Sequence, residues 1–104
     1  MIQQSIVVLH DQIAVLQAST PENTPVAKYL ALMIAGCVRA IAILQHQPSM
    51  TDAHDLYSPL NAVSGFAELL LVDDYPLTAD QRAGLIAIRA EVEAIIVSVK
   101  ASYG

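Results

Sequence analysis

Apolar residues recur at steps of three and four along four stretches of the chain, and this spacing predicts four helices. The stretches are residues 2–18, about 25–46, 51–73 and about 78–102. The first carries a narrow apolar seam, whereas the second is apolar over so wide an arc that we expect burial on more than one side. The inner faces of the first, third and fourth are Ile2, Ile6, Leu9, Ile13 and Leu16; Leu56, Leu60, Val63, Ala67 and Leu70; and Leu85, Ile88, Val92, Ile95 and Val99. We therefore expect an all-α fold.

Prolines and short polar residues mark where these helices end. They cluster at residues 19–25, 47–49 and 73–77, which we interpret as the three connections. Thr24 stands before a proline at the first position of the second helix, an arrangement typical of a helix cap. Thr78 has capping-box spacing with the glutamine three residues later, so we expect it to open the fourth helix.

The third helix has a second stripe that contains no large apolar side chain. Its members lie on the side of the helix away from the apolar stripe, and they are His54, Ser58, Asn61, Gly65 and Glu68. We therefore expect His54 to project from the solvated side, where a partner molecule can reach it. Pro59 cannot donate a hydrogen bond to the carbonyl of residue 55, so the helix is expected to bend beside His54.

These residue types favour phosphoryl chemistry. A neutral imidazole nitrogen can attack phosphorus in line, and covalent capture divides one difficult transfer into two easier ones. Asp55 could polarise the imidazole of His54, fix its tautomer or take its proton. Ser58, one turn further along, could hydrogen-bond the phosphoryl group or a water that hydrolyses it.

Residues 54–61 read His-Asp-Leu-Tyr-Ser-Pro-Leu-Asn. This octapeptide resembles the phosphoacceptor motif of the dimerisation and phosphoacceptor (DHp, HisKA-type) domain of sensor histidine kinases. The resemblance covers about the second half of the chain, residues 50–100. Beyond the octapeptide it includes Ala62, Gly65, Phe66, Glu68, Leu69 and Leu70, and then Leu77, Thr78, Gln81, Arg82, Leu85, Ile88 and Arg89.

The resemblance implies a role for each candidate site residue. By this similarity His54 carries the phosphoryl group, Asp55 assists its transfer, and Ser58 takes the place of the residue that positions water for dephosphorylating a partner. The sequence departs from the family pattern at two positions. Tyr57 stands where the family usually has Arg or Lys, and Asp55 is one methylene shorter than the commoner Glu.

The resemblance also implies an assembly. The chain is expected to form one domain, residues 1–104, with an N-terminal helical pair, residues 1–48, and a DHp-like hairpin, residues 49–104. In the family, a hairpin like residues 50–102 pairs with its copy in a two-fold four-helix bundle, around which the N-terminal pair would pack. The alternative is a monomer in which all four helices form one bundle, as in single-chain histidine phosphotransfer proteins. We favour the homodimer.

The sequence contains no Gly-rich phosphate cradle, so we do not expect it to make phosphohistidine from ATP unaided. The phosphate on His54 would come from a separate histidine kinase or from a receiver-domain aspartyl phosphate, with Mg²⁺ bound by that partner.

Three hypotheses follow. The first is a phosphorelay protein with His54 as the shuttle, the second a non-catalytic dimerisation and docking module, which Tyr57 favours, and the third a fragment of a longer kinase.

Composition narrows the range of partners. The net charge of −5 argues against nucleic acid, because nothing here would replace phosphate counterions. No basic start precedes an apolar segment, so we expect no secretory signal and a cytoplasmic location. The apolar run 26–44 is interrupted by Lys28 and Arg39, which argues against a membrane span. We interpret Cys37 as a buried filler, and we expect no cofactor and no metal, since His46 and His54 alone make a poor metal site.

Overall fold

The computed structural model of the chain describes residues 2–46, 54–72 and 76–103, and in these ranges it contains four helices and no strand. The helices are α1 (Ile2–Ala18), α2 (Pro25–His46), α3 (His54–Val72) and α4 (Ala79–Tyr103). The all-α class is therefore confirmed. The predicted start of the third helix, at Ser49 or Thr51, lies outside the described residues.

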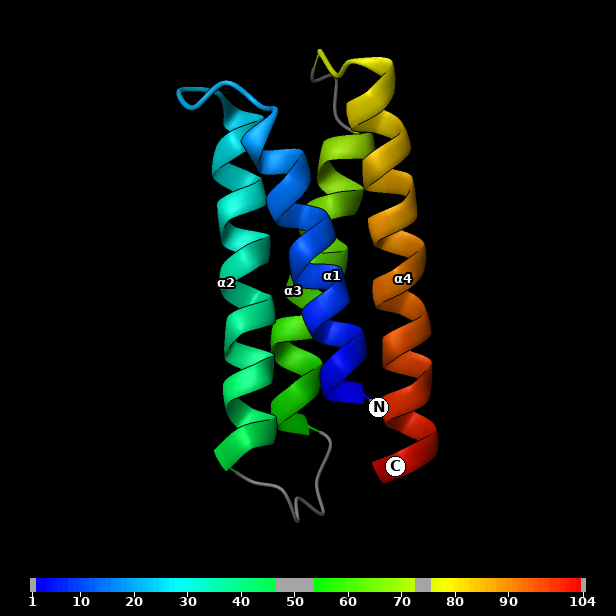
Figure 1. The fold of residues 1–104 in the computed structure, drawn as a ribbon. Coiled ribbons are helices and arrows are strands. Elements are labelled where there is room, and N and C mark those ends of the chain that lie inside the picture. The colour runs from blue at the N-terminus through cyan, green and yellow to red at the C-terminus, as the bar shows by residue number, and fades with distance from the viewer. Residues whose placement is uncertain (1, 47–53, 73–75, 104) are drawn as a thin grey trace.

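The helices lie side by side and alternate in direction, so that the molecule is an elongated bundle of 42 × 20 × 18 Å (Figure 1). Within the described ranges α1 contacts α2 and α4, and α3 also contacts α2 and α4. Each helix is therefore flanked by two antiparallel neighbours, as in an up-down-up-down bundle. The first residue of α3 lies at the end of the bundle where α2 finishes, the same end as both termini of the drawn chain (Figure 1).

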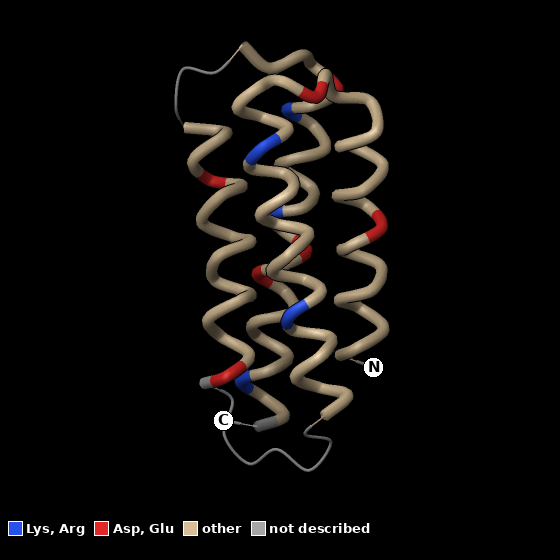
Figure 2. The backbone as a smooth tube through the Cα atoms, turned by 90° about the vertical axis from the view of Figure 1, so that its left-hand side faces the viewer, with Lys and Arg blue, Asp and Glu red and all other residues tan. Residues whose placement is uncertain are grey.

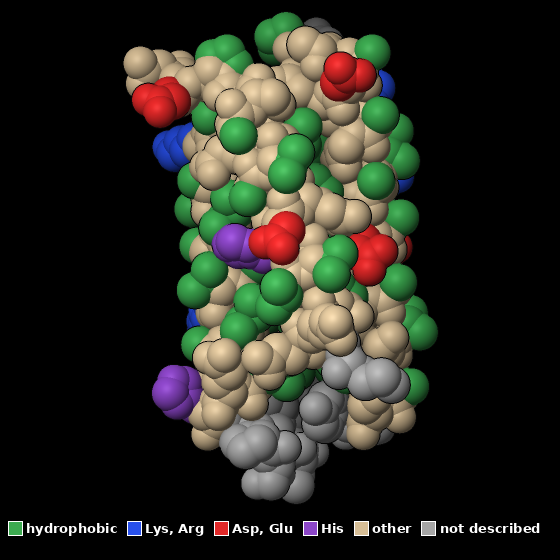
Figure 3. All heavy atoms as spheres, viewed as in Figure 1, with side chains coloured by type: hydrophobic (Ala, Val, Ile, Leu, Met, Phe, Trp, Pro, Cys, Tyr) green, Lys and Arg blue, Asp and Glu red, His purple; other side chains and the backbone are tan. Residues whose placement is uncertain are grey.

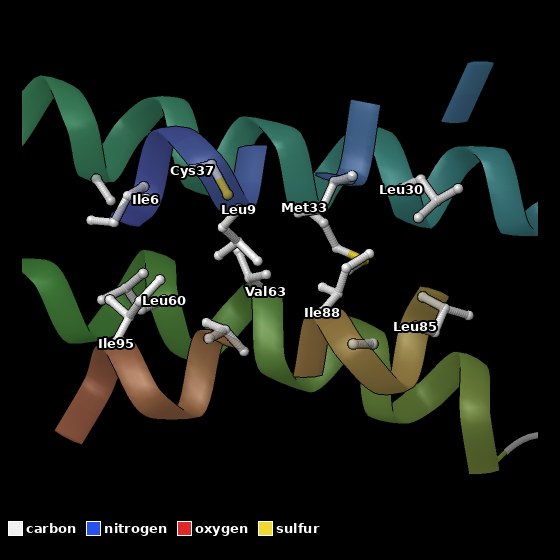
Figure 4. Close-up of a cluster of buried hydrophobic side chains, with 14 of the residues drawn as sticks. Ile6, Leu9, Leu30, Met33, Cys37, Leu60, Val63, Leu85, Ile88 and Ile95 are labelled. Carbon is white, nitrogen blue, oxygen red and sulfur yellow. The ribbon is translucent and has the colours of Figure 1, made fainter. Parts of the chain in front are cut away.

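One apolar core runs along the axis of the bundle, with side chains supplied by all four helices (Figure 4). Every residue of the predicted inner faces of α3 and α4 is buried, which confirms both stripes. Met33 and Cys37 of α2 are also fully buried, and the burial of Cys37 confirms its interpretation as a filler. Val38 lies within the wide apolar arc of α2 but is 52% exposed, because α2 buries only the side that faces α1 and α3.

Both predicted helix caps are present. The backbone N–H of Ala27 donates to Oγ1 of Thr24 at 3.2 Å. At the start of α4 the N–H of Gln81 donates to Oγ1 of Thr78 at 3.0 Å, and the N–H of Thr78 donates to Oε1 of Gln81 at 2.9 Å. These bonds satisfy backbone donors that a helix start otherwise leaves without partners, which explains why α2 and α4 begin where they do.

The two hairpins bury equivalent positions. Ile6, Leu9 and Ile13 of α1 precede the Thr24 cap by the same numbers of residues as Leu60, Val63 and Ala67 precede the Thr78 cap. The second helices repeat the pattern with a slip of one residue. Their buried residues, at identical spacing, are Val26, Leu30, Met33, Cys37 and Ala40 in α2 and Gln81, Leu85, Ile88, Val92 and Ile95 in α4. The hairpin α1–α2 therefore fills the place in the bundle that a second α3–α4 hairpin would fill.

This arrangement bears on the predicted assembly. The inner faces of α3 and α4, which the resemblance assigns to pairing with a second copy, are covered by α1 and α2 of the same chain. The described residues thus follow the single-chain alternative. Homodimerisation itself stays a prediction, and it needs a surface other than these inner faces.

Candidate functional site

The candidate phosphoacceptor is the first residue of α3. The backbone of His54 is helical, whereas its side chain and residues 51–53 lie outside the described residues. Asp55 and Ser58 are described, and the side chains of both are exposed. The structure therefore places two of the three candidate site residues at the solvent, within the first turns of the helix that His54 begins.

The predicted polar stripe of α3 is confirmed for its described members. Ser58, Asn61, Gly65 and Glu68 are all exposed, while Leu56 and its partners on the opposite stripe are fully buried. The rotation of α3 about its own axis is thus fixed by burial on one side. That position 54 belongs to the same stripe stays a prediction from helical spacing, since four residues span slightly more than one turn.

Tyr57, which departs from the family pattern, does not extend the exposed stripe. Its ring is half-buried and packs against the apolar core. The side chain therefore contributes to the stability of the first turns of α3, and the exposed face gains no positive charge at this position.

At Gly36 the backbone of α2 comes very close to α3 around Pro59 and Val63. A Cβ atom at Gly36 would lie 2.9 Å from Cγ2 of Val63 and 3.0 Å from the carbonyl oxygen of Pro59. Both distances are shorter than van der Waals contact allows, so only glycine lets α2 approach the backbone of α3 this closely. Pro59 is itself buried in this seam. The contact fixes α3 against α2 about one turn beyond the candidate acceptor.

Sequence reasoning missed Gly36. Its signal is a glycine within an apolar helix, where it costs about 1 kcal/mol relative to alanine and therefore needs a structural reason. The same seam continues toward the other end of the bundle, where the rings of Tyr29 and Phe66 lie 5.6 Å apart between centroids. A tilted aromatic pair at this distance adds to the attraction between α2 and α3.

Burial raises the pKa of the Cys37 thiol to about 11, so the thiolate is scarce near neutral pH and the residue acts as a small apolar filler. Nδ1 of His10 lies 3.3 Å from Oδ1 of Asp11 on the surface of α1. His46 is exposed at the end of α2. Across the described part of the chain, no three His, Cys, Asp or Glu residues gather in a metal-binding group.

Among the described residues, positive and negative charges are interspersed and do not gather by sign. In Figure 2 the Lys, Arg, Asp and Glu positions are scattered along the four helices. Among the described segments, α2 alone is long and apolar enough to cross a membrane by length and composition. Core helices of soluble proteins share this property, and seven residues of α2 are buried in the bundle.

Comparison with known proteins gives no match: no family model, no curated protein sequence and no solved structure is similar to this chain.

Proposed function

We propose that the protein transfers phosphoryl groups in a two-component signalling relay, with His54 as the acceptor. The observation that supports this most is the division of α3 into two faces. One face is buried in the core, and the other presents Asp55 and Ser58 to solvent within the first turns after His54. A transferred group has to reach a second protein, so an acceptor on an exposed and rigidly oriented helix suits this role.

The proposed step exchanges one bond to phosphorus for another. A nitrogen of the neutral His54 imidazole attacks the phosphorus of an aspartyl phosphate on a receiver domain, while the bond from phosphorus to the aspartyl oxygen breaks. The receiver recovers its carboxylate and His54 becomes a phosphoimidazolium. The carboxylate of Asp55 accepts the proton from the other ring nitrogen or holds it in place. In the reverse direction the same steps deliver the phosphoryl group to a receiver.

Ser58 is exposed and follows His54 by four residues, which is about one helical turn. Its hydroxyl can donate a hydrogen bond to a phosphoryl oxygen or hold a water near phosphorus. We assign it the positioning of the phosphoryl group and, with a suitable partner, of the water that hydrolyses it.

The proposed partners follow from this chemistry. A receiver domain, or a separate histidine kinase, supplies or takes the phosphoryl group, and the Mg²⁺ that neutralises the transferring phosphate is bound by that partner. Such relays operate in the cytoplasm, and we propose that location for this chain. A nucleic-acid partner is not proposed, given the net charge of −5.

The chain has three histidines, and the test uses His10 and His46 as controls for His54. Wild-type protein is incubated with phosphorylated receiver domains from the same genome, and the label on the chain is tested for stability. We expect a label that is lost in acid and kept in alkali. His54→Ala should lower the amount of this label at least 100-fold. His10→Ala and His46→Ala, on α1 and α2, should keep the wild-type level.

If no receiver labels the wild type, or if His54→Ala is labelled as strongly as His46→Ala, then His54 is not the shuttle.

A second candidate function is supported by Tyr57. Its half-buried ring occupies the position of a basic residue in the resembling family, which is expected if the hairpin docks onto kinases or receivers without carrying phosphate. Under this hypothesis His54→Ala leaves signalling unchanged. Disrupting the buried stripes at Leu60 or Leu85 is expected to abolish it, because the docking surface depends on this packing.

A further inference from the structure

The two hairpins meet along two seams, α2 against α3 and α1 against α4, and these seams are filled differently. Tyr29 and Gly36 of α2 lie seven residues apart, and both face α3. The correspondence between the buried residues of α2 and α4 places Gly84 where α2 has Tyr29. It also places Glu91 where α2 has Gly36. A carboxylate side chain therefore stands in the α1–α4 seam at the level where the α2–α3 seam needs a glycine for close approach.

The α1–α4 seam is closed near the starts of α2 and α4. A Cβ atom at Gly84 would lie 3.3 Å from both methyl carbons of Leu16, so α1 and α4 approach closely there. Nε2 of Gln81 donates a hydrogen bond of 3.4 Å to Oγ1 of Thr20, and both residues are buried. Glu91 follows Gly84 by about two helical turns. From this level onward the seam is open.

The open part is a groove of about 650 Å³ between the first turns of α1 and the second half of α4. This volume is within the range of small-molecule binding sites, which combine apolar walls with a few polar groups. Both kinds of group are present, since the lining includes Val8, Ala94 and Ile95 together with Glu91, Ser98 and Ser102. Val8 is 48% exposed and Ile95 is 3% exposed, so the groove extends from the surface down to the core.

Glu91 is the one charged side chain among the described residues that line the groove. It is half-buried, and no described Lys, Arg or His lies within ion-pair distance of its carboxylate. In Figure 3, which shows this side of the bundle, the Lys and Arg side chains of the described residues lie toward the edges of the view. A carboxylate that is partly shielded from water attracts a cation more strongly than one in bulk solvent, because the effective dielectric constant around it is lower. The groove is therefore complementary in charge to a cation.

We propose that this groove binds a small organic cation, an amine whose ammonium group pairs with the carboxylate of Glu91. The apolar body of the amine lies along Val8 and Ala94, over the core residue Ile95. One carboxylate and a groove of this volume suit a small molecule, whereas a protein partner would need a wider contact area. The site is independent of the phosphotransfer proposal, because it is built from α1 and α4 and the candidate acceptor belongs to α3.

The test is a titration of the isotope-labelled full chain, followed by the amide shifts in nuclear magnetic resonance spectra. The probe is benzylamine, which is cationic at pH 7, and benzyl alcohol is a neutral probe of nearly the same shape. We expect saturable shifts centred on Glu91, Ala94 and Ser98, with a Kd of about 1 mM for benzylamine. Benzyl alcohol should bind about tenfold more weakly, since it lacks the charge that meets Glu91.

Two variants assign the charge effect to one residue. Glu91→Gln keeps the size of the side chain, so it should weaken benzylamine about tenfold and leave benzyl alcohol unchanged. Glu93→Gln is the matched control: it removes the same charge from an exposed position of α4 outside the groove, and it should bind both probes like the wild type. Glutamine is a good helix former, so far-UV circular dichroism should be unchanged in both variants.

Three results would overturn the proposal. The first is a wild type whose shifts do not saturate or do not centre on the groove. The second is a wild type that binds benzyl alcohol as tightly as benzylamine. The third is an equal effect of Glu91→Gln and Glu93→Gln on benzylamine, because the attraction then comes from the net charge of the chain and not from the groove.

Discussion

Leu60→Ala is expected to destabilise the bundle by about 3 kcal/mol, because a fully buried leucine is lost from the centre of the core and leaves a cavity. For a domain of this size the melting temperature should fall by roughly 15 °C. Thermal unfolding followed by circular dichroism measures the change. The variant matters for function because burial of Leu60 fixes the rotation of α3, and this rotation decides which residues face outward.

Leu69→Ala is the matched control, since it removes the same atoms from the same helix. This side chain is 43% exposed, so the expected cost is below about 1 kcal/mol. Equal costs for the two variants would mean that α3 is rotated differently from the arrangement described here, and the exposed stripe would lose its basis.

Gly36→Ala is expected to destabilise the protein by about 2 kcal/mol. The added methyl group meets Cγ2 of Val63 at 2.9 Å and the carbonyl oxygen of Pro59 at 3.0 Å. Neither atom moves easily, because valine is restricted at χ1 and the carbonyl belongs to the backbone. The strain exceeds the gain of about 1 kcal/mol that alanine brings to a helix interior. Chemical denaturation with urea measures the difference in the free energy of unfolding.

Gly65→Ala should have the opposite sign. A Cβ at Gly65 meets nothing within 4 Å, and the residue is exposed on α3. The substitution is expected to stabilise the protein by about 0.5–1 kcal/mol through helix propensity alone. If Gly36→Ala is stabilising too, α2 does not approach the proline region closely, and the account of how α3 is held must be abandoned.

Much of the fold could be predicted from the sequence because its signals are local. Thr24 and Thr78 form hydrogen bonds with residues three positions away, so spacing alone indicates both caps. The buried stripe of α3 follows from helical periodicity, which does not depend on what the helix packs against. For the same reason the exposure of Ser58 could be predicted together with the burial of Leu60.

The rest depends on contacts between helices, which periodicity does not specify. An amphipathic face looks the same whether it packs on its own chain or on a second copy, so the inner faces could not decide between the two assemblies. The close approach at Gly36 needs the position of Pro59 on another helix. The exposure of Val38 could not be predicted either, because the part of α2 that α1 and α3 cover is narrower than the apolar arc of this helix.

The most direct measurement of the central claim locates the phosphoryl group on the wild-type chain. After incubation with a phosphorylated receiver domain, mass spectrometry of peptides kept at neutral or alkaline pH identifies the modified residue. The account predicts one phosphohistidine, at His54, with His10 and His46 unmodified. A phosphoryl group found on His10 or His46, or none on any histidine with any receiver, would contradict it.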